Sequence, residues 1–467
     1  MNFAASNSEA GVFCTVCAST DIPSLDGVNK NDPCGQWNSL SLAVILLQLA
    51  SDSMKLLDSS WTALKNPVFR QLWLASVISG TCTAAHDGAA TWMMNKLTGS
   101  PFLISLMSTV ASLSFFLFTL PAGVLADKVD RQKLVCTINL SLAAMALGLA
   151  VLGWLHLLNP YLILVCMFFI GIGFAFNAPA WTSIMPQVVS DAELPSAATL
   201  SGLQLNISGI IGPALGGLLV PLAGAKFVFA VNAVSFLVVV RAIRRWKQPT
   251  VLAKVPSESF FKSFRTVIGY VRSAPGFQVV LARNCLFALF ISAIPALMPV
   301  LGLKVLHLSS SNLGLLFTSM GIGSVAGAAF VVPWLRTHFS SDFIMLSANL
   351  LIVLAYALVA LARQAEAVFV VAALAGMGWT LSASELWVTV QRAMPDWARG
   401  RLNATVIMIS QRAMVLGGVI RGSAAAIAGA SYTFIGAAVL FLASLILTGR
   451  LHILDNPSSR FTTTGPN

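Results

Sequence analysis

The sequence predicts an all-α polytopic membrane protein with twelve transmembrane helices in two halves of six. Three observations predict it. Hydrophobic residues make up 57% of the 467-residue chain and charged residues only 10%, whereas a typical soluble protein carries about 25% charged residues. Apolar runs of about 20 residues recur, and each can cross the roughly 30 Å hydrocarbon layer as a helix. Basic residues gather in alternate loops between these runs, as they do in proteins that cross a membrane repeatedly.

The apolar runs form two sets of six, separated by the basic, polar stretch RAIRRWKQPTVLAKVPSESFFKSFRTVIGYVRS. The first six spans are expected near residues 71–93, 102–125, 134–156, 161–181, 198–222 and 226–243. The second six are expected near residues 279–303, 311–335, 343–362, 366–388, 402–423 and 429–449.

These spans divide the chain into two halves, a central loop and two tails. The expected regions are an N-terminal tail (1–53), a first half (54–243), a basic cytoplasmic loop (244–278), a second half (279–449) and a cytoplasmic tail (450–467).

The N-terminal tail differs from the rest of the chain. It is polar and weakly patterned, so we expect it to be disordered, and its apolar piece at 42–50 is too short to span a membrane. The sequence from Met54, MKLLDSSWTALKNPVFRQLW, is typical of a membrane protein whose N-terminus stays in the cytoplasm. Our hypothesis is that the native chain begins at Met54.

The two halves echo each other weakly. IMPQVVSDAELPSAATL precedes span five, which carries Gly216 and Gly217, and AMPDWARGRLNATV precedes span eleven, which carries Gly417 and Gly418. Parallel repeats of this kind, related by an axis normal to the membrane, occur in transporters built from two similar halves.

The basic residues orient the spans, because Lys and Arg collect in cytoplasmic loops. With a cytoplasmic N-terminus, both termini and most basic residues lie inside. The inside segments then hold Lys65, Arg70, Lys128, Arg131, Lys133, the cluster from Arg241 to Arg272, Arg336, Arg392, Arg399, Arg401 and Arg450. The outside loops hold only Lys96, Lys226, Lys304 and Arg363. This asymmetry explains the net charge of +11 without a nucleic-acid partner.

The loop between spans two and three, GVLADKVDRQK, concentrates charge in a chain that has little. Asp127 ends span two, where the helix dipole disfavours an anion, so it needs a partner such as Arg131 or the N-terminus of span three. Gly123 is expected to let span two pack closely on another helix. The loop is predicted to be a conformational latch, although a solvated loop of membrane anchors is an alternative. The latch residues are Gly123, Asp127, Lys128, Arg131 and Lys133.

The same loop resembles the signature loop of the major facilitator superfamily, in which basic residues follow a Gly and an acidic residue. The likeness extends over nearly the whole chain from Met54 in the blocks NPVFRQLWLASVISG, LTGSP, LPAGVLADKVDRQKL, GIGFAFNAPAWTSIMPQVV, ELPSAATLSGLQLNISGIIGPALGG and MPDWARGRLNATV. These blocks look like the enterobactin-exporter-like branch, the transmembrane secretion effectors. The resemblance implies a major facilitator fold and proton-driven export across the plasma membrane, the inner membrane in bacteria.

Span one carries an intramembrane carboxylate. Asp87 lies 16 residues after Gln71, about 24 Å along a helix and therefore in the outer part of the membrane. A carboxylate at this depth is costly unless it faces a cavity, where it can take up and release a proton. Asp87 and the adjacent His86 are therefore candidates for the proton or substrate site, and a wet outer vestibule is the alternative.

Span five contains NISGIIGPALGG, which resembles the exporter motif of drug antiporters. Small residues let helices approach and slide, and proline kinks a helix, so this face is a candidate gate; ordinary tight packing is the alternative. Relatives commonly carry Arg three residues after Asn206, where this chain has Gly209, and span four also lacks the Arg of many proton antiporters. The gate residues are Gly209, Gly212, Pro213, Gly216 and Gly217, with Asn206 as a further candidate for the proton or substrate site.

Three charges in spans ten and eleven are unusual for positions inside a membrane. An unpaired charge in hydrocarbon costs several kcal/mol, so Glu385 in span ten needs a partner or a cavity. Arg412 and Arg421 in span eleven are nine residues apart and lie on opposite helix faces. We expect a Glu385–Arg412 pair, with Arg421 extending to the outer surface. Glu385 and Arg412 are further candidates for the proton or substrate site.

The sequence contains no enzyme or cofactor motif. Five histidines are scattered, CTVC lacks a second ligand pair for zinc, and no phosphate-binding G-x-x-x-x-G-K-[ST] is present. We therefore predict no enzyme activity, no metal and no cofactor.

The predicted function is secondary-active export of a small organic molecule, such as a siderophore, a drug-like compound or a secondary metabolite. The expected mechanism is proton antiport with alternating access in a monomer within the lipid bilayer. Aromatic and methionine side chains are candidates for lining an adaptable cavity. They are Trp92, Met93, Phe115, Phe176, Met298, Trp379 and Trp387. The alternatives are a facilitator or importer of small solutes, and a non-transporting scaffold or sensor on the same fold.

Overall fold

The computed structural model describes residues 61–246, 269–395 and 399–448. Contacts divide the chain into Met1–Asp58 and Ser59–Asn467, and every described residue belongs to the second unit. The tails expected at 1–53 and 450–467, and most of the central loop, lie outside the described residues.

The first half contains six long helices after a short 3₁₀ turn. Asparagine side chains cap the starts of α3 and α6, each of which has Pro as its first residue, because Pro suits the first turn of a helix. The elements are η1 (Thr62–Lys65), α3 (Pro67–Leu97), α4 (Pro101–Lys128), α5 (Arg131–Trp154), α6 (Pro160–Val188), η2 (Asp191–Glu193), α7 (Leu194–Ala223) and α8 (Ala225–Arg245).

The second half also contains six spans, of which the first two are interrupted near prolines. A proline ring clashes with the carbonyl four residues earlier, so the helix before Pro295 ends at Ile291. The seventh span is α10 (Pro275–Ile291), α11 (Ala293–Val300) and the π-turn η3 (Leu301–Val305). The eighth span is α12 (Ser310–Ala326), the π-turn η4 (Gly327–Val331) and α13 (Val332–His338). The remaining helices are α14 (Ser341–Leu361), α15 (Ala365–Arg392), α16 (Arg399–Ala428) and α17 (Ala430–Thr448).

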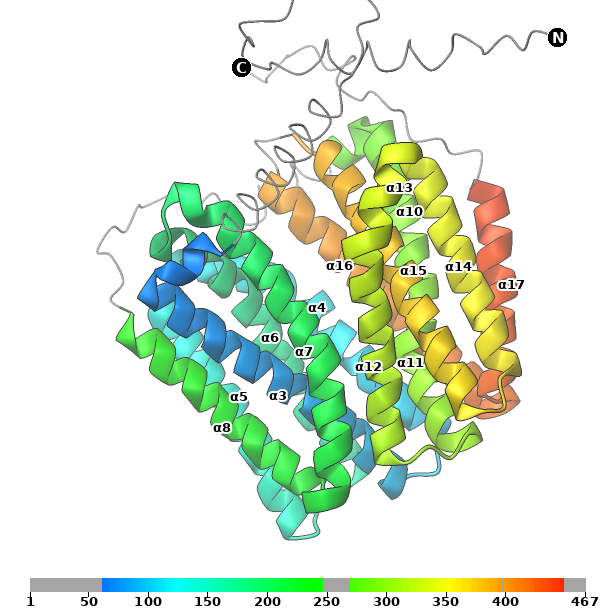
Figure 1. The fold of residues 1–467 in the computed structure, drawn as a ribbon, viewed down its shortest axis with the longest axis horizontal. Coiled ribbons are helices and arrows are strands. Elements are labelled where there is room, and N and C mark those ends of the chain that lie inside the picture. The colour runs from blue at the N-terminus through cyan, green and yellow to red at the C-terminus, as the bar shows by residue number, and fades with distance from the viewer. Residues whose placement is uncertain (1–60, 247–268, 396–398, 449–467) are drawn as a thin grey trace, which may run out of the picture. The chain divides into compact units, whose positions relative to one another are not determined.

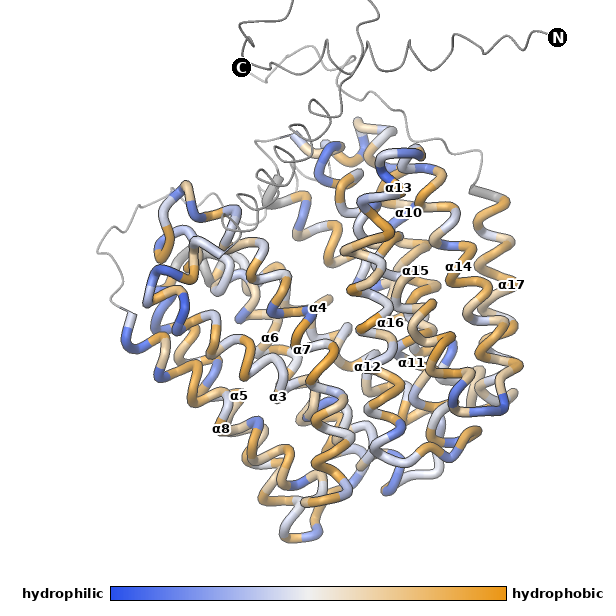
Figure 2. The backbone as a smooth tube through the Cα atoms, viewed as in Figure 1, coloured by the Kyte–Doolittle hydropathy of each residue, from blue (hydrophilic) through white to orange (hydrophobic). Residues whose placement is uncertain are grey.

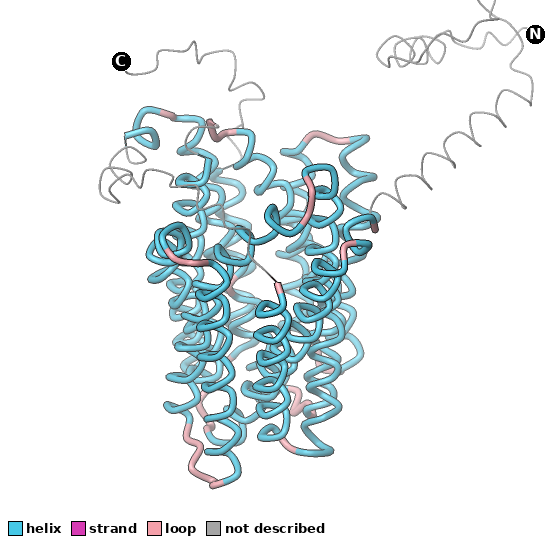
Figure 3. Tube along the Cα trace, turned by 90° about the vertical axis from the view of Figure 1, so that its left-hand side faces the viewer, coloured by secondary structure: helices cyan, strands magenta, loops and turns pink. Residues whose placement is uncertain are grey.

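The predicted all-α architecture is confirmed for the part of the chain that the structure describes (Figure 3). Ten of its helical segments are long and apolar enough to cross a membrane, and Ala430–Ile446 is a shorter apolar helix. The helix α3 is not among the ten, and it is the helix that carries His86 and Asp87.

The repeat is visible at one matched turn in each half. Gly224 joins α7 to α8 with φ +82°, and Gly429 joins α16 to α17 with φ +88°. Glycine adopts positive φ without the steric penalty of a side chain. Both halves therefore turn between their last two helices on a left-handed glycine.

Successive helices alternate in direction, so the loops gather at two ends. We call the end at which α3 starts the basic end, because it carries Arg70, Arg131, Arg244 and Arg336, and the opposite end the far end. In Figure 1 the basic end is uppermost. Apolar residues dominate the long helices between the ends (Figure 2), and many large apolar side chains on them are exposed, as expected for surfaces that face lipid.

Each half is held together by contacts between its own helices; in the second half, for example, α12 packs on α15 and α14 packs on α17. In the first half α3 packs on α7 and α8, and α4 packs on α6. Between the halves the principal contacts join α4 to α16 and α7 to α12. These two pairs are the seams described next.

Candidate functional site

The first seam joins α7 to α12 by backbone-to-backbone contact. A Cβ on Gly217 would lie 3.0–3.1 Å from backbone atoms of Ser310, Ser311 and Gly314. Two hydroxyls of α12 donate across the seam, Ser311 Oγ to the Gly217 carbonyl and Thr318 Oγ1 to the Ile210 carbonyl, each at 3.0 Å. The small residues therefore let the two backbones approach closely enough for these hydrogen bonds.

The span-five glycines divide between two partners. Gly212 and Gly216 face α3, where a Cβ would overlap Thr81, Ala84 or Ala85. The backbones of Gly209 and Pro213, with Gly217, face Gly321 and Gly314 of α12 instead. Of the five predicted gate residues, three thus lie on the seam between the halves and two lie within the first half.

The second seam joins α4 to α16 through side chains. A Cβ on Gly418 would overlap the side chain of Thr109, and one on Gly422 would overlap the side chain of Ser105. Both hydroxyls donate within α4, Ser105 Oγ to the Phe102 carbonyl at 2.8 Å and Thr109 Oγ1 to the Ser105 carbonyl at 3.3 Å. Neither of these two hydroxyls therefore donates to α16.

The seam contacts lie between the far end and the middle of the spans. They involve the start of α4 and α12 and the later part of α7 and α16. Lys304 Nζ adds a bond to the Thr98 carbonyl at 3.1 Å, also at that end. Toward the basic end, the ribbons of α7 and α13 diverge (Figure 1). The close contacts described here thus lie toward one end of the two halves, an arrangement compatible with rocking of the halves in alternating access.

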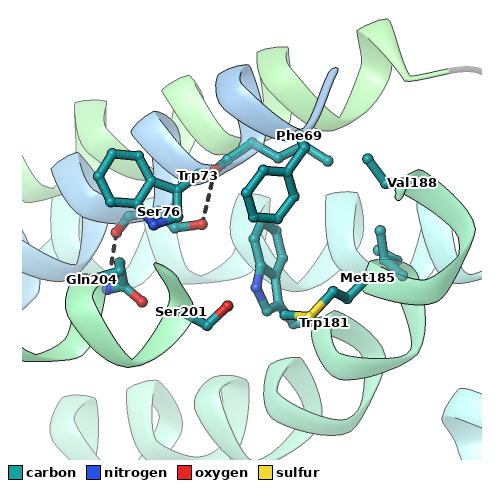
Figure 4. Close-up of a pocket in the computed structure, with 10 residues that line it drawn as sticks. Phe69, Trp73, Ser76, Trp181, Met185, Val188, Ser201 and Gln204 are labelled. Atoms are coloured by element: carbon teal, nitrogen blue, oxygen red, sulfur yellow. Dashed lines mark hydrogen bonds between the residues drawn. The ribbon is translucent and has the colours of Figure 1, made fainter. Parts of the chain in front are cut away.

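A small pocket lies between α3, α6 and α7 in the basic-end part of the first half (Figure 4). Its volume of about 20 Å³ has room for one water. Trp73 Nε1 donates to the Leu200 carbonyl at 2.7 Å, and Gln204 Nε2 donates to the Ser76 carbonyl at 3.3 Å. The lining residues are Phe69, Leu72, Trp73, Ser76, Trp181, Ile184, Met185, Val188, Ser201 and Gln204.

Asp87 lies on the same face of α3 as this pocket. It follows Phe69 by 18 residues, about five helical turns, so both side chains leave α3 in the same direction. Asp87 is exposed, whereas Phe69 is buried beside α6. No described residue donates to its carboxylate. The carboxylate is therefore available to a proton or a ligand.

His86 points elsewhere. It is fully buried against Phe229 of α8, with ring centroids 4.6 Å apart, and neither ring nitrogen has a hydrogen-bond partner. Thr83 Oγ1 donates to Asn232 Oδ1 in the same α3–α8 contact at 3.3 Å. His86 and Asp87 thus face different surroundings, and the buried His86 is not in the wet vestibule considered for both.

Asn206 is exposed on α7, eleven residues before Gly217. Eleven residues are about three helical turns, so Asn206 shares the face that meets α12 farther along the helix. It lies on the basic-end side of the seam contacts and is free of them. It stays a candidate for contacting a ligand between the halves.

Glu385 pairs with a different arginine from the one expected. Its Oε1 lies 2.7 Å from Arg336 Nε of α13. The Glu385 side chain is 2% exposed and that of Arg336 is 44% exposed. Arg412 is exposed on α16, so the expected Glu385–Arg412 pair is wrong. No hydrogen bond or ion pair within the described residues joins any two of Asp87, His86, Asn206, Glu385 and Arg412.

Arg421 does not extend to the outer surface as expected. It is 7% exposed, and its Nη1 donates to the Leu289 carbonyl at 2.6 Å and to Ser292 Oγ at 3.0 Å. The opposite placement of Arg412 and Arg421 on α16 is confirmed, because one is exposed and the other is buried.

The structure describes only some of the residues of the predicted latch. α4 extends to Lys128, but the side chains of Asp127 and Lys128 lie outside the described residues. Asp130 caps α5 by accepting from the Lys133 amide at 3.1 Å. A Cβ on Gly123 would meet nothing within 4 Å, so the close helix contact expected there is wrong. The latch itself stays a prediction for Gly123, Asp127, Lys128, Arg131 and Lys133.

The structure adds residues that the sequence did not single out. Gln132 Nε2 donates to the carbonyls of Ile243 and Trp246 at 2.8 and 2.7 Å, tying the start of α5 to the end of α8.

Trp73 and Trp181 line the pocket (Figure 4), whereas Met298, which was expected to line a cavity, is 1% exposed in the core. The sequence pattern that could have predicted this aromatic lining is a pair of aromatic residues at i and i+4, as in Phe69 and Trp73.

A larger cavity of about 210 Å³ lies within the second half, between α10, α14, α15 and α17. Arg283 and Asp342 form an ion pair of 2.6 Å at its edge. The described residues contain no cluster of three or more His, Cys, Asp or Glu able to hold a metal ion.

Comparison with known proteins gives one family and consistent relatives. The model of the transmembrane secretion effector family matches residues 58–462. Enterobactin exporter EntS of Citrobacter koseri is 24% identical over 404 residues, covering 84% of this chain and 94% of that protein. Macrolide efflux protein A of Streptococcus pyogenes is 23% identical over 261 residues, covering 56% of this chain. This match spans 64% of the macrolide efflux protein's own length.

Solved structures share the fold at low identity. A nucleoside transporter, NupG, has a TM-score of 0.67 at 13% identity, over 81% of this chain and 99% of that chain. A bacterial homologue of the human lysosomal transporter Spinster, in an inward-facing and occupied conformation, has a TM-score of 0.67 at 14% identity. That match covers 84% of this chain and 99% of the homologue.

Proposed function

This chain belongs to the transmembrane secretion effector family of the major facilitator superfamily, which is a family of membrane transporters and not of enzymes, and from this premise we propose that it exports a small amphiphilic organic molecule by proton antiport. The observation that carries the proposal is the joining of two helical halves toward the far end, through seams of small residues. Separation of these seams, with closure at the basic end, exposes a central site to the other side of the membrane.

The direction and cargo of the proposal rest on the relatives. EntS is named as an enterobactin exporter and the macrolide protein as an efflux protein. The cargo we propose is therefore a siderophore, a drug-like compound or a secondary metabolite with apolar and polar parts.

Asp87 is the proposed proton carrier. Its carboxylate is exposed on the face of α3 that also carries Phe69, and it has no basic partner among the described residues. Binding of a proton removes a charge that is costly inside the membrane, and release restores it, so protonation and cargo binding can alternate at one site.

The placement in the membrane follows from charge. We propose that the basic end faces the cytoplasm, since Lys and Arg collect on that side, with both termini cytoplasmic in a bacterial inner membrane. We further propose that the chain acts as a monomer and that the far-end seams close the outer side in the state described here.

The first test compares a deletion strain with the same strain restored by the wild-type chain, grown with and without iron. Mass spectrometry of medium and cell extract is expected to find a compound that the deletion strain retains and the restored strain secretes. An iron-linked chelator would identify a siderophore. Identical profiles, together with unchanged resistance to a panel of macrolides and other toxic amphiphiles, would contradict export.

The second test concerns proton coupling. In everted membrane vesicles with an acidic interior, wild type should accumulate the identified compound, and Asp87→Asn should lose the response to the pH gradient while Asp87→Glu keeps part of it. Asp191→Asn, at an exposed carboxylate in η2, is the matched control. Flux that persists in wild type without a gradient response would instead identify a facilitator.

A further inference from the structure

The seventh span is broken, and the break exposes carbonyl groups. α10 ends at Ile291 and α11 begins at Ala293, four residues after the Leu289 carbonyl. The ring of Pro295 prevents a regular helix through this point. The carbonyl end of α10 therefore lies inside the second half, where it carries the partial negative charge of a helix C-terminus.

Side chains from two other helices bind these carbonyls. Arg421 of α16 donates to the Leu289 carbonyl at 2.6 Å and to Ser292 Oγ at 3.0 Å, and Ser292 Oγ itself donates to Leu289 at 2.7 Å. The Tyr356 hydroxyl of α14 donates to the Phe290 carbonyl at 2.9 Å. The Leu289 and Phe290 carbonyls beside the break thus each accept a hydrogen bond from another helix.

Arg421 is charge-compensated without a carboxylate. No ion pair of Arg421 occurs within the described part of the chain. Its guanidinium instead lies 5.5 Å from the centroid of the Phe290 ring and against the carbonyl end of α10. A ring face and a helix C-terminus both attract a cation, so the break in span seven is the counter-charge for Arg421.

The same stretch of α16 faces the other half of the protein. Gly417 and Arg421 face the break, where a Cβ on Gly417 would overlap Ser292 Oγ and the guanidinium. The next residues, Gly418 and Gly422, face α4 across the second seam. α11, which begins at the break, also packs on α4. One helix turn therefore connects the break to the seam.

We propose that Arg421 is a positioning residue that locks the broken seventh span to α16, so that α11 and α16 present one rigid surface to α4 at the far end. Loss of the cation frees the carbonyl end of α10 and loosens both the break and the second seam. Arg421 acts here through the helices that it joins and contacts no cargo. The inference does not rest on the proposed function, because its test needs no substrate.

The test is hydrogen–deuterium exchange of the full chain in lipid nanodiscs, read by mass spectrometry. Arg421→Met keeps the length of the side chain and removes the charge and the donors. It is expected to raise exchange tenfold or more in peptides covering 286–298 and several-fold in peptides covering 101–112. Arg421→Lys should restore at least half of the protection, because its ammonium can reach the same oxygens. Arg412→Met, an exposed arginine on the same helix, should match wild type.

Two outcomes would overturn the proposal. One is wild-type exchange at 286–298 in Arg421→Met; the other is an equal rise throughout α14 and α15, which would indicate general destabilisation. If Arg421→Met does not fold, Arg421→Gln gives the decision, because it removes the cation and keeps a polar side chain at the same place. A rise confined to the same two peptides supports the lock, and no rise at 286–298 rejects it.

Discussion

The two seams close the same end of the molecule by different means. In the α7–α12 seam, Ser311 and Thr318 donate to carbonyls of the opposite half, each at 3.0 Å. In the α4–α16 seam, Ser105 and Thr109 donate to carbonyls of their own helix. Separation of the first seam must break hydrogen bonds inside a membrane, whereas Ser105 and Thr109 of the second keep their hydrogen bonds when it separates and lose packing contacts.

The seams also differ in what the glycines touch. At Gly314 a Cβ would lie 2.9 Å from the Cα of Gly217, so backbone opposes backbone. At Gly418 it would meet the side chain of Thr109, which can change rotamer or be replaced. The first seam is therefore a fixed register between the halves, and the second is an adaptable contact.

The largest expected effect is that of Gly314→Ala. The added methyl group meets backbone on α7 that cannot move without shifting the helix, and overpacking of this kind costs about 3 kcal/mol. The closed far end should lose stability on the order of 100-fold relative to a separated state. Pulsed EPR distances between labels at Leu157 and Leu361, which are exposed at the far end of each half, measure this in a cysteine-free background.

Gly436→Ala is the control for that experiment. Gly436 lies in α17, where a Cβ would meet nothing within 4 Å, so the same substitution adds a methyl group without a clash. It should leave the EPR distance distribution unchanged. An equal response of Gly436→Ala and Gly314→Ala would show that glycine content, and not the register of the seam, sets the closed state.

The helical architecture could be predicted from the sequence because it depends on hydropathy and charge, which can be read from each stretch of the chain separately. Twelve spans, their grouping in two halves and the one-sided basic residues all depend on local composition. The glycines of span five show what local composition does not predict, namely which neighbouring helix each residue faces. Gly212 and Gly217 look alike in the sequence, yet one faces α3 and the other faces α12. Which face meets which helix depends on tertiary packing.

The buried charges show the same limit. Helix periodicity correctly placed Arg412 and Arg421 on opposite faces. It did not identify the partner of Glu385, because Arg336 lies on another helix 49 residues away. Nor did periodicity predict that the Arg421 side chain points inward, because its acceptor is the Leu289 carbonyl beside the break between α10 and α11.

A smaller effect is expected for Gly418→Ala, and it should be reversible. The added methyl group overlaps the Thr109 side chain and should cost about 1–2 kcal/mol. Thr109→Ala removes the overlapping atoms, so the double variant should recover at least about 1 kcal/mol relative to the sum of the single variants. The EPR distances again give the population of the closed state. Strictly additive single and double variants would mean that the α4–α16 seam is as rigid as the α7–α12 seam.

The smallest effect separates hydrogen bonding from packing with one matched pair of substitutions. Thr318→Val removes a hydroxyl that crosses between the halves, and Thr109→Val removes one that bonds within α4. Both keep the shape of the side chain. A net hydrogen bond contributes about 1 kcal/mol, so Thr318→Val should shift the EPR populations toward separation about fivefold. Thr109→Val should shift them less than twofold, because its hydroxyl bonds the same helix in either state. If the two variants respond equally, the bonds across α7–α12 do not hold the closed end, and packing alone accounts for both seams.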